Sequence, residues 1–234
     1  MLRCQTSTDW MQYSEIVKKL KSLSNPKNVA GMARFGIGGE NMLGISIPNL
    51  RALARKIGKN KKLAKQLWDS KIHEARILAG MVDEAQNVTA KEMDRWVRDF
   101  DSWDVCDQVC MNLFRYTKNA PKKCFEWAGQ KDEFVKRAGF ALMAALAFAK
   151  NDMSDAEFKK FLPVIKREST DERNYVRKAV NWALRQIGKR NKVLNKEAIK
   201  VAREILKIES KSARWIAGDA LRELTGEAAQ KRLN

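Results

Sequence analysis

Apolar residues recur along this chain at the spacing of amphipathic helices. Blocks of about 10 to 18 residues each carry one apolar face, and short polar breaks such as residues 24–26, 86–89 and 168–171 separate them. Runs that alternate apolar and polar residues, which would indicate strands, are almost absent, and the chain has only 4 prolines. The pattern predicts an all-α protein with about twelve or thirteen helices.

Three of the predicted helices open alike. Motifs in which cations precede or flank small and apolar residues begin at Lys136, Arg177 and Arg214, which are 41 and 37 residues apart. A period of about 40 residues with two helices per unit is typical of HEAT-type solenoids, which curve and present a concave face. Because no segment has the composition of a linker, we expect residues 1–234 to form a single α-solenoid domain.

The predicted helix at residues 175–187 leaves one tryptophan outside its apolar face. The apolar arc consists of Val176, Val180, Ala183, Leu184 and Ile187. Trp182 lies about 140° from the centre of this arc. Its neighbours on that side are Lys178, Arg185 and Lys189. An aromatic ring surrounded by cations suits nucleic acid, because bases stack on it and phosphates attract the cations. The alternative is that Trp182 fills a gap against a neighbouring helix.

The charge of the chain favours a polyanionic partner. Lys and Arg number 46 and Asp and Glu 28, which gives a formal net charge of +18 and a pI near 9.9. Self-repulsion of this size destabilises a compact domain and usually accompanies nucleic-acid binding. The cations are spread along the chain, for example at residues 59–62 and at Lys189 and Arg190, so we expect a basic surface on the folded body. A protein-interaction scaffold would more often have an acidic or amphipathic groove.

The sequence does not favour a membrane span, a disulfide framework or a metal site. The longest apolar run, residues 138–149, has 12 residues and predicts a buried helix, and the opening residues lack the apolar stretch of a signal peptide. Without a secretory context, we expect no disulfide framework. The four cysteines are Cys4, Cys106, Cys110 and Cys124. Because His73 is the only histidine and no second cysteine pair follows, we expect no metal and no cofactor.

A carboxylate stands at the rim of another predicted apolar face. Around residues 101–115 this face consists of Trp103, Val105, Cys106, Val109, Cys110 and Leu113. Asp107 lies at its edge, one helical turn after Trp103. A carboxylate beside an indole and partly shielded from water stabilises a cationic group better than one in open solvent. The alternative is that the first turn caps the helix and Trp103 belongs to the core, which is the interpretation we prefer for Asp104.

Arg137 is the exceptional residue of the mostly apolar segment 134–149. A guanidinium in such a helix is costly unless it emerges into a groove or meets an anion. Its position near the start of the helix favours the edge of a groove. A buried structural ion pair is the alternative.

Together these motifs resemble the AlkD-type DNA alkylpurine glycosylases, a family of HEAT-like repeat DNA alkylation repair proteins. The resemblance rests on four stretches in the family's order and runs from about residue 12 to 225. These stretches are residues 35–51, which include Phe35-Gly-Ile and Met42-Leu-Gly-Ile-Ser-Ile-Pro, then Ser102-Trp-Asp-Val-Cys-Asp, then Lys136-Arg-Ala, and finally residues 177–185. Before the carboxylate the family often has a second aromatic and a hydroxyl residue, whereas this chain reads Trp-Asp-Val-Cys.

The resemblance implies both an architecture and a reaction. Members of the family cradle duplex DNA in a basic concavity and excise cationic N-alkylated purines such as 3-methyladenine and 7-methylguanine, without a cofactor. Carried over by position, the cleft tryptophans are Trp103 and Trp182, the catalytic carboxylate is Asp107, the cleft arginine is Arg137, and a phosphate-contacting arginine is Arg185. Lys178, Lys189 and Arg190 join it as expected DNA-binding residues.

This function is chemically consistent with the residues. Alkylation of a ring nitrogen makes the purine cationic and weakens its glycosidic bond, and a carboxylate stabilises the oxocarbenium-like sugar that remains. Indole faces attract such cations. We therefore expect a cytoplasmic, nucleoid-associated monomer whose partner is double-stranded DNA with alkylated bases. The alternative is a non-catalytic HEAT-repeat protein that binds structured DNA or RNA.

Overall fold

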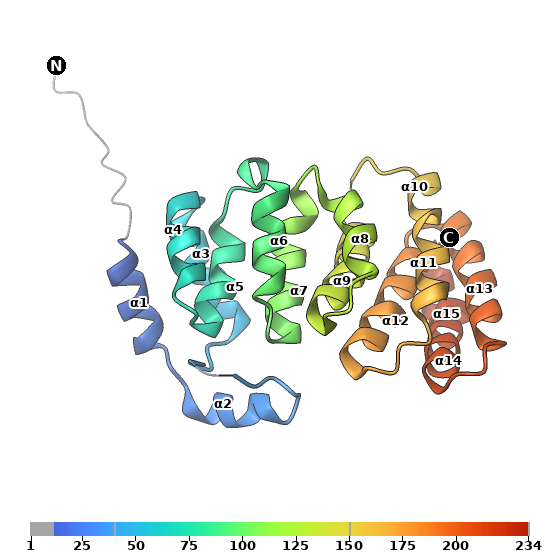
Figure 1. Cartoon of the computed structure of the whole chain (residues 1–234), viewed down its shortest axis with the longest axis horizontal. Coiled ribbons are helices and arrows are strands. Elements are labelled where there is room, and N and C mark those ends of the chain that lie inside the picture. Colours follow the sequence, from blue (N-terminus) through green and yellow to red (C-terminus); the bar gives the residue numbers. More distant parts are fainter. Residues whose placement is uncertain (1–11, 40, 150, 234) are drawn as a thin grey trace, which may run out of the picture. The chain divides into compact units, whose positions relative to one another are not determined.

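Helices make up the described part of the chain. The computed structural model describes residues 12–39, 41–149 and 151–233, so Cys4 lies outside the described residues. These ranges contain fifteen α-helices and two short 3₁₀ helices and no strand (Figure 1). The prediction of an all-α protein is confirmed. The chain divides into two compact units, residues 1–87 and 88–234. The expectation of one continuous solenoid domain stays a prediction.

Unit 1 is the smaller of the two. Its helices are α1 (Tyr13–Ser22), α2 (Pro26–Ala33), α3 (Ile47–Ile57), α4 (Lys61–Asp69), α5 (His73–Val82) and the 3₁₀ helix η1 (Ala85–Asn87). A buried carboxylate organises its loop at residues 43–45. Glu74 accepts hydrogen bonds from the backbone N–H groups of Leu43 at 2.8 Å, Gly44 at 2.6 Å and Ile45 at 3.3 Å. The loop also requires glycine at position 44, because its φ is +71° and a Cβ there would lie 2.3 Å from the backbone oxygen of Asn25.

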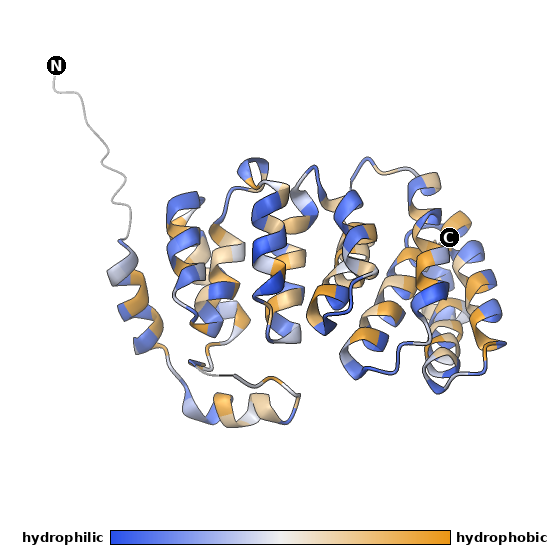
Figure 2. Cartoon of the chain, viewed as in Figure 1, coloured by the Kyte–Doolittle hydropathy of each residue, from blue (hydrophilic) through white to orange (hydrophobic). Residues whose placement is uncertain are grey.

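Unit 2 contains the residues of interest for function. Its helices are α6 (Ala90–Arg98), α7 (Trp103–Asn112), η2 (Phe114–Tyr116), α8 (Ala120–Ala128), α9 (Glu133–Phe148), α10 (Asp155–Lys159), α11 (Phe161–Glu168), α12 (Asn174–Gly188), α13 (Lys192–Leu206), α14 (Lys211–Thr225) and α15 (Glu227–Leu233). Side-chain caps fix several of their starts. Thr89 and Glu92 form a capping box at α6, and Ser210 caps α14. Hydrophilic and hydrophobic residues alternate around α6 and α13 (Figure 2).

Four helices of unit 2 follow one another as neighbours. Helix α9 packs against α7 and α12, and α12 packs against α14. A second set covers them, with α8 against α9 and α13 against both α12 and α14. The three repeated motifs each begin three residues after the start of their helix, Lys136 in α9, Arg177 in α12 and Arg214 in α14. The sequence repeat therefore corresponds to equivalent positions in successive helices.

Helix α9 is the centre of unit 2. Its residues from Ala138 to Ala147 are all buried, as the apolar run predicted. Close packing against α8 depends on Gly139, because a Cβ there would lie 2.5 Å from the backbone nitrogen of Ala128. No helix within the described ranges is both long and apolar enough to cross a membrane.

Candidate active site

Asp107 and Arg137 form a two-bonded ion pair between α7 and α9. Arg137 Nε donates to Asp107 Oδ1 at 3.0 Å, and Arg137 Nη2 donates to Asp107 Oδ2 at 2.8 Å. The Asp107 side chain is 15% exposed and that of Arg137 only 6%. Of the two expectations for Arg137, the structure has the buried ion pair and not a free position at a groove edge. The pair still leaves Asp107 partly open to solvent.

Arg137 connects this pair to two further groups. Its Nη1 donates to the backbone oxygen of Tyr175 in α12 at 2.6 Å, so the guanidinium contacts α7 and α12 while belonging to α9. Its Cζ atom lies 5.8 Å from the centroid of the Trp103 ring. The ring of Tyr175 stacks on Phe134, with 5.6 Å between centroids. Arg137 therefore lies against both Asp107 and Trp103.

Burial determines the charge behaviour of Asp107. Desolvation raises the pKa of Asp107 above its ordinary value, although the charge of Arg137 and its hydrogen bonds act in the opposite direction. For Arg137, burial acts to lower the pKa, but the charge and hydrogen bonds of Asp107 raise it overall. The arginine therefore stays cationic. A carboxylate with a raised pKa that is partly open to solvent is typical of functional sites.

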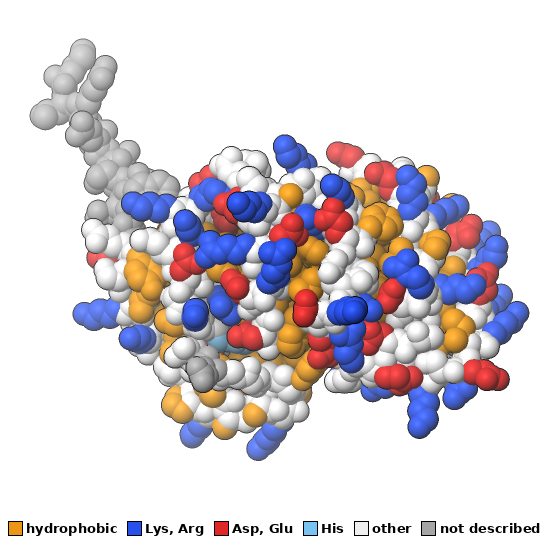
Figure 3. All heavy atoms as spheres, viewed as in Figure 1, with side chains coloured by type: hydrophobic (Ala, Val, Ile, Leu, Met, Phe, Trp, Pro, Cys, Tyr) orange, Lys and Arg blue, Asp and Glu red, His pale blue; other side chains and the backbone are white. Residues whose placement is uncertain are grey.

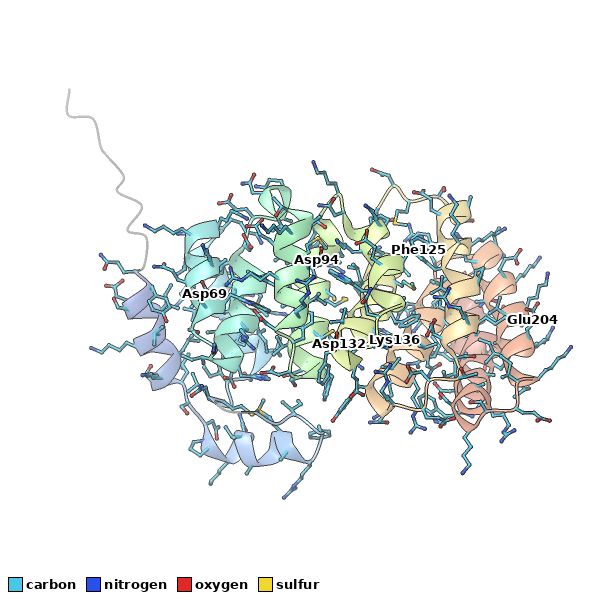
Figure 4. All side chains as sticks on the ribbon, viewed as in Figure 1. Asp69, Asp94, Phe125, Asp132, Lys136 and Glu204 are labelled. Atoms are coloured by element: carbon cyan, nitrogen blue, oxygen red, sulfur yellow. The ribbon has the colours of Figure 1, made fainter. Side chains whose placement is uncertain are left out.

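Other paired carboxylates in unit 2 behave differently from Asp107. Asp94, which is labelled on α6 in Figure 4, accepts hydrogen bonds from Lys123 at 2.7 Å and Trp127 at 2.9 Å, both residues of α8. Although burial acts to raise it, these hydrogen bonds lower the pKa of Asp94 overall. The same balance lowers the pKa of Glu223, where Lys189 and Arg185 donate. These carboxylates are typical structural ion-pair partners.

The two cysteines of α7 face the protein interior. Cys106 and Cys110 are free and fully buried, and their sulfur atoms lie 3.9 Å from the Phe134 oxygen and 3.8 Å from the Ala138 oxygen. Burial raises the pKa of the Cys106 thiol well above its ordinary value, so it is neutral at pH 7. Within the residues that the structure describes, no group of three or more His, Cys, Asp and Glu side chains is arranged to hold a metal ion.

Trp182 is half-buried, whereas the five apolar-arc residues of α12 are fully buried. Its indole therefore lies outside the core. With the Gln186 amide oriented to suit its neighbours, the amide oxygen accepts hydrogen bonds from Trp182 Nε1 and Lys189 Nζ, both at 3.2 Å. Sequence reasoning missed Gln186, although its spacing of four residues from Trp182 places it on the same side of the helix. The convergence of Trp182 with the Asp107 cluster stays a prediction.

Two of the expected DNA-binding residues are held by acidic side chains of α14. Arg185 donates to Glu223 and lies 3.6 Å from Asp219, and Lys189 donates to Glu223 at 2.6 Å. Both cations are partly exposed, at 30% and 24% of the side chain. In the free protein these acids therefore offset part of the positive charge that α12 offers.

The other two expected DNA-binding residues differ from each other. Lys178 is exposed on α12. Arg190 instead clamps the end of α9, with hydrogen bonds from its guanidinium to the backbone oxygens of Ala147 at 3.2 Å, Ala149 at 2.8 Å and Asn151 at 3.2 Å. On the face shown in Figure 3, Lys and Arg side chains are interspersed with Asp and Glu and do not form one basic band. The expected concave basic groove stays a prediction.

Comparisons with known proteins identify the family and the fold. Residues 16–224 match the model of a family described as "DNA alkylation repair enzyme". A solved structure described as "a new family of proteins related to the HEAT-like repeat DNA glycosylases with affinity for branched DNA structures" matches with a TM-score of 0.79 at 19% identity, covering 95% of this chain and 96% of the other. At that identity the likeness shows the fold, which is the HEAT-like helical-repeat fold.

A second solved structure is less similar. A designed armadillo repeat protein in complex with the peptide (KR)4 matches with a TM-score of 0.37 at 12% identity, covering 79% of this chain and 88% of the other. A search of curated proteins gave no significant match.

Proposed function

Because the chain belongs to the DNA alkylation repair enzyme family, we propose that it is a DNA glycosylase for cationic N-alkylated purines. Its substrates are 3-methyladenine and 7-methylguanine in duplex DNA. The observation that carries the proposal is the cluster of Asp107, Arg137 and Trp103, in which a carboxylate partly open to solvent is paired with a guanidinium that lies over an indole. The two units of the chain belong to a fold shared with proteins related to DNA glycosylases.

The reaction is hydrolysis of the N-glycosidic bond. The bond between the sugar C1′ and the purine nitrogen breaks, its electron pair goes to the cationic base, and the base leaves neutral. The sugar becomes oxocarbenium-like, and the negative charge of Asp107 stabilises it. A water molecule then bonds to C1′ and releases one proton to Asp107 or to solvent. Because the leaving base needs no protonation, one carboxylate is sufficient for the protein's part in the chemistry.

Arg137 acts as a positioning residue for Asp107. Its two parallel hydrogen bonds fix the plane of the carboxylate, and its charge opposes the effect of burial on the pKa of Asp107. The carboxylate is therefore oriented and more readily ionised, while its exposed side remains available to the sugar. Trp103 adds an indole face that attracts both the cationic base and the developing sugar cation.

Trp182 and the cations of α12 bind the DNA in this proposal. The exposed part of the Trp182 indole contacts the deoxyribose at the lesion, and Lys178, Arg185 and Lys189 contact phosphates. Arg185 and Lys189 exchange Glu223 for phosphate oxygens when DNA arrives. Since no step requires a base-reading pocket at Asp107, the protein captures the backbone and leaves the lesion largely within the helix. Neutral lesions such as uracil are then poor substrates.

The test of this function is release of 7-methylguanine from methylated duplex DNA. Wild type releases the base, and Asp107→Asn is about 10²–10³-fold slower because one preorganised charge is lost. DNA affinity of the variant is unchanged or slightly higher, since a carboxylate repels phosphates. Asp104→Asn, the same change in the same helix, is the matched control and keeps the wild-type rate. Equal rates for wild type and Asp107→Asn would contradict the catalytic role.

A second candidate is a binder of structured DNA without glycosylase activity. The solved relative with affinity for branched DNA structures favours it. Such a binding function requires the cations of α12 but does not require Asp107. If wild type releases no base from any alkylated duplex while it binds branched DNA tightly, the binding function is the correct one.

A further inference from the structure

A cavity of about 780 Å³ lies in unit 2 where α9 and α12 end, with α15 on another side. Pockets that bind small ligands have volumes of roughly 300 to 1,000 Å³, so a single nucleotide fits this one. The residues that matter for its chemistry are Phe148, Gln186, Lys189, Arg190 and Arg232. It is a separate feature from the Asp107 cluster, and no step of the proposed hydrolysis uses it.

The rim of the cavity carries an exposed aromatic ring. Phe148 ends α9 and is 65% exposed, although the residues from Ala138 to Ala147 of the same helix are buried. A flat apolar ring open to solvent beside a cavity is a platform on which a nucleic-acid base stacks, whatever its sequence.

The cavity is also positively charged. The guanidinium of Arg190 bonds to backbone oxygens and to the Asn151 side-chain oxygen at 3.1 Å, and all of these acceptors are neutral. Its charge is therefore fixed in place but not cancelled by these partners. Arg232 is exposed, and Asp152 is the one carboxylate among the described lining residues. Of the three cations that line the cavity, Lys189 is paired with Glu223 of α14, so Arg190 and Arg232 supply the positive charge. Arg190 therefore attracts phosphate by its charge, since four of its five N–H donors are already used, and the exposed Arg232 supplies free donors for phosphate oxygens.

Gln186 connects the cavity to the proposed DNA-binding side of α12. It lines the cavity, while its amide oxygen accepts from Trp182 Nε1 and Lys189 Nζ, both at 3.2 Å. The side chain of Gln186 therefore contacts Trp182 on one side and lines the cavity on the other. A DNA strand whose backbone passes Trp182 reaches the cavity within the length of a nucleotide or two.

We infer that this cavity binds an unpaired nucleotide of a DNA strand, with its base on Phe148 and its phosphate near Arg232 and Arg190. The ligand is unpaired because both faces of a base inside a duplex are already stacked and cannot reach Phe148. The inference rests on the proposed function only in that DNA is the partner.

The test compares fluorescein-labelled duplex DNA with the same duplex carrying a short single-stranded flap, by fluorescence anisotropy. Wild type is expected to bind the flap DNA more tightly. Phe148→Ala is expected to lose roughly 5- to 100-fold in affinity for the flap DNA and to keep its affinity for the duplex. Phe148→Trp is expected to keep both. The matched control is Leu206→Ala, since Leu206 is 45% exposed on α13 and is not part of the lining.

Two further readouts separate stacking from charge. The fluorescence of 2-aminopurine in the flap is quenched by wild type and not by Phe148→Ala. Arg232→Gln weakens flap binding and lowers the salt slope for the flap DNA by about one counterion. Equal affinity of wild type for duplex and flap DNA, or equal losses on both probes in Phe148→Ala, overturns the inference. Base release from methylated DNA is measured separately, so failure of the glycosylase proposal and failure of this one are distinguishable.

Discussion

At the scale of single residues, the chemistry of Asp107 depends on how its partner binds it. Two parallel hydrogen bonds from Arg137 need the planar fork of a guanidinium, which a lysine cannot supply. Removing the arginine leaves a buried carboxylate without its cation. Changes at Arg137 therefore act on both the orientation and the ionisation of Asp107.

This dependence gives a pH prediction. The proposed reaction needs ionised Asp107, so we expect the rate to fall as the pH is lowered through the pKa of Asp107, which burial places above the ordinary aspartate value of 3.8. In Arg137→Gln the pKa of Asp107 rises further, because the opposing cation is gone. The acid limb of the single-turnover rate therefore moves to higher pH. Coincident acid limbs in the two proteins would show that the ionisation of Asp107 does not control the rate.

The same variant has a stability cost that the experiment must control. Breaking a buried ion pair by removing one partner typically costs about 3–5 kcal/mol. Thermal unfolding of Arg137→Gln is measured first, and rates are compared at a temperature where both proteins are folded. A second variant, Arg137→Lys, keeps the charge and loses the fork, so its acid limb shifts less while its maximal rate falls.

The sequence predicted part of this site and could not predict the rest. The position of Asp107 at the edge of an apolar face follows from helical periodicity, because the spacing from Trp103 is local. Its partner Arg137 is 30 residues away, and only packing of α7 against α9 determines that they meet. Likewise, helical periodicity predicted that Arg185 and Lys189 lie on the polar side of α12, but it could not show that Glu223 of α14 binds both.

At the scale of elements, the packing of α9 against α8 sets a tight limit on residue size. Gly139→Ala places a Cβ 2.5 Å from a backbone nitrogen of α8, which cannot move as a side chain does. We expect a loss of about 1–3 kcal/mol from overpacking, which exceeds the gain of up to about 1 kcal/mol in helix propensity. The urea concentration at the midpoint of unfolding measures this loss of stability.

Gly218→Ala in α14 is the matched control for this prediction. A Cβ at this position meets only the Arg222 guanidinium at 3.8 Å, an ordinary contact with a flexible side chain. We expect its urea midpoint to stay or to rise, because alanine favours the helix by about 0.5–1 kcal/mol over glycine. If both variants lost the same stability, the loss would come from placing alanine in these helices and not from the contact of α9 with α8.

At the scale of the whole molecule, the net charge of +18 predicts a steep dependence of duplex affinity on salt. Arg185→Ala removes one of the proposed phosphate contacts, so we expect it to weaken binding to all sequences alike and to flatten the slope of log K against log salt. Glu223→Gln should strengthen binding, because Arg185 and Lys189 then reach phosphates without first leaving a carboxylate. Filter binding at several salt concentrations measures both. The affinity for duplex DNA must fall in Arg185→Ala and rise in Glu223→Gln. Affinity changes of the same sign in both variants would contradict these contacts.

Arg137 contacts three helices of successive repeats, its own α9, α7 through Asp107 and α12 through the Tyr175 oxygen. The proposed base excision should therefore depend on the packing of these three helices against one another. Repeat proteins open locally before they unfold globally, and amide hydrogen exchange resolves such openings. When urea detaches α12 from α9, the guanidinium loses an anchor while most helices persist. Base excision should then disappear at a lower urea concentration than the far-ultraviolet circular dichroism signal, in step with faster amide exchange in α12.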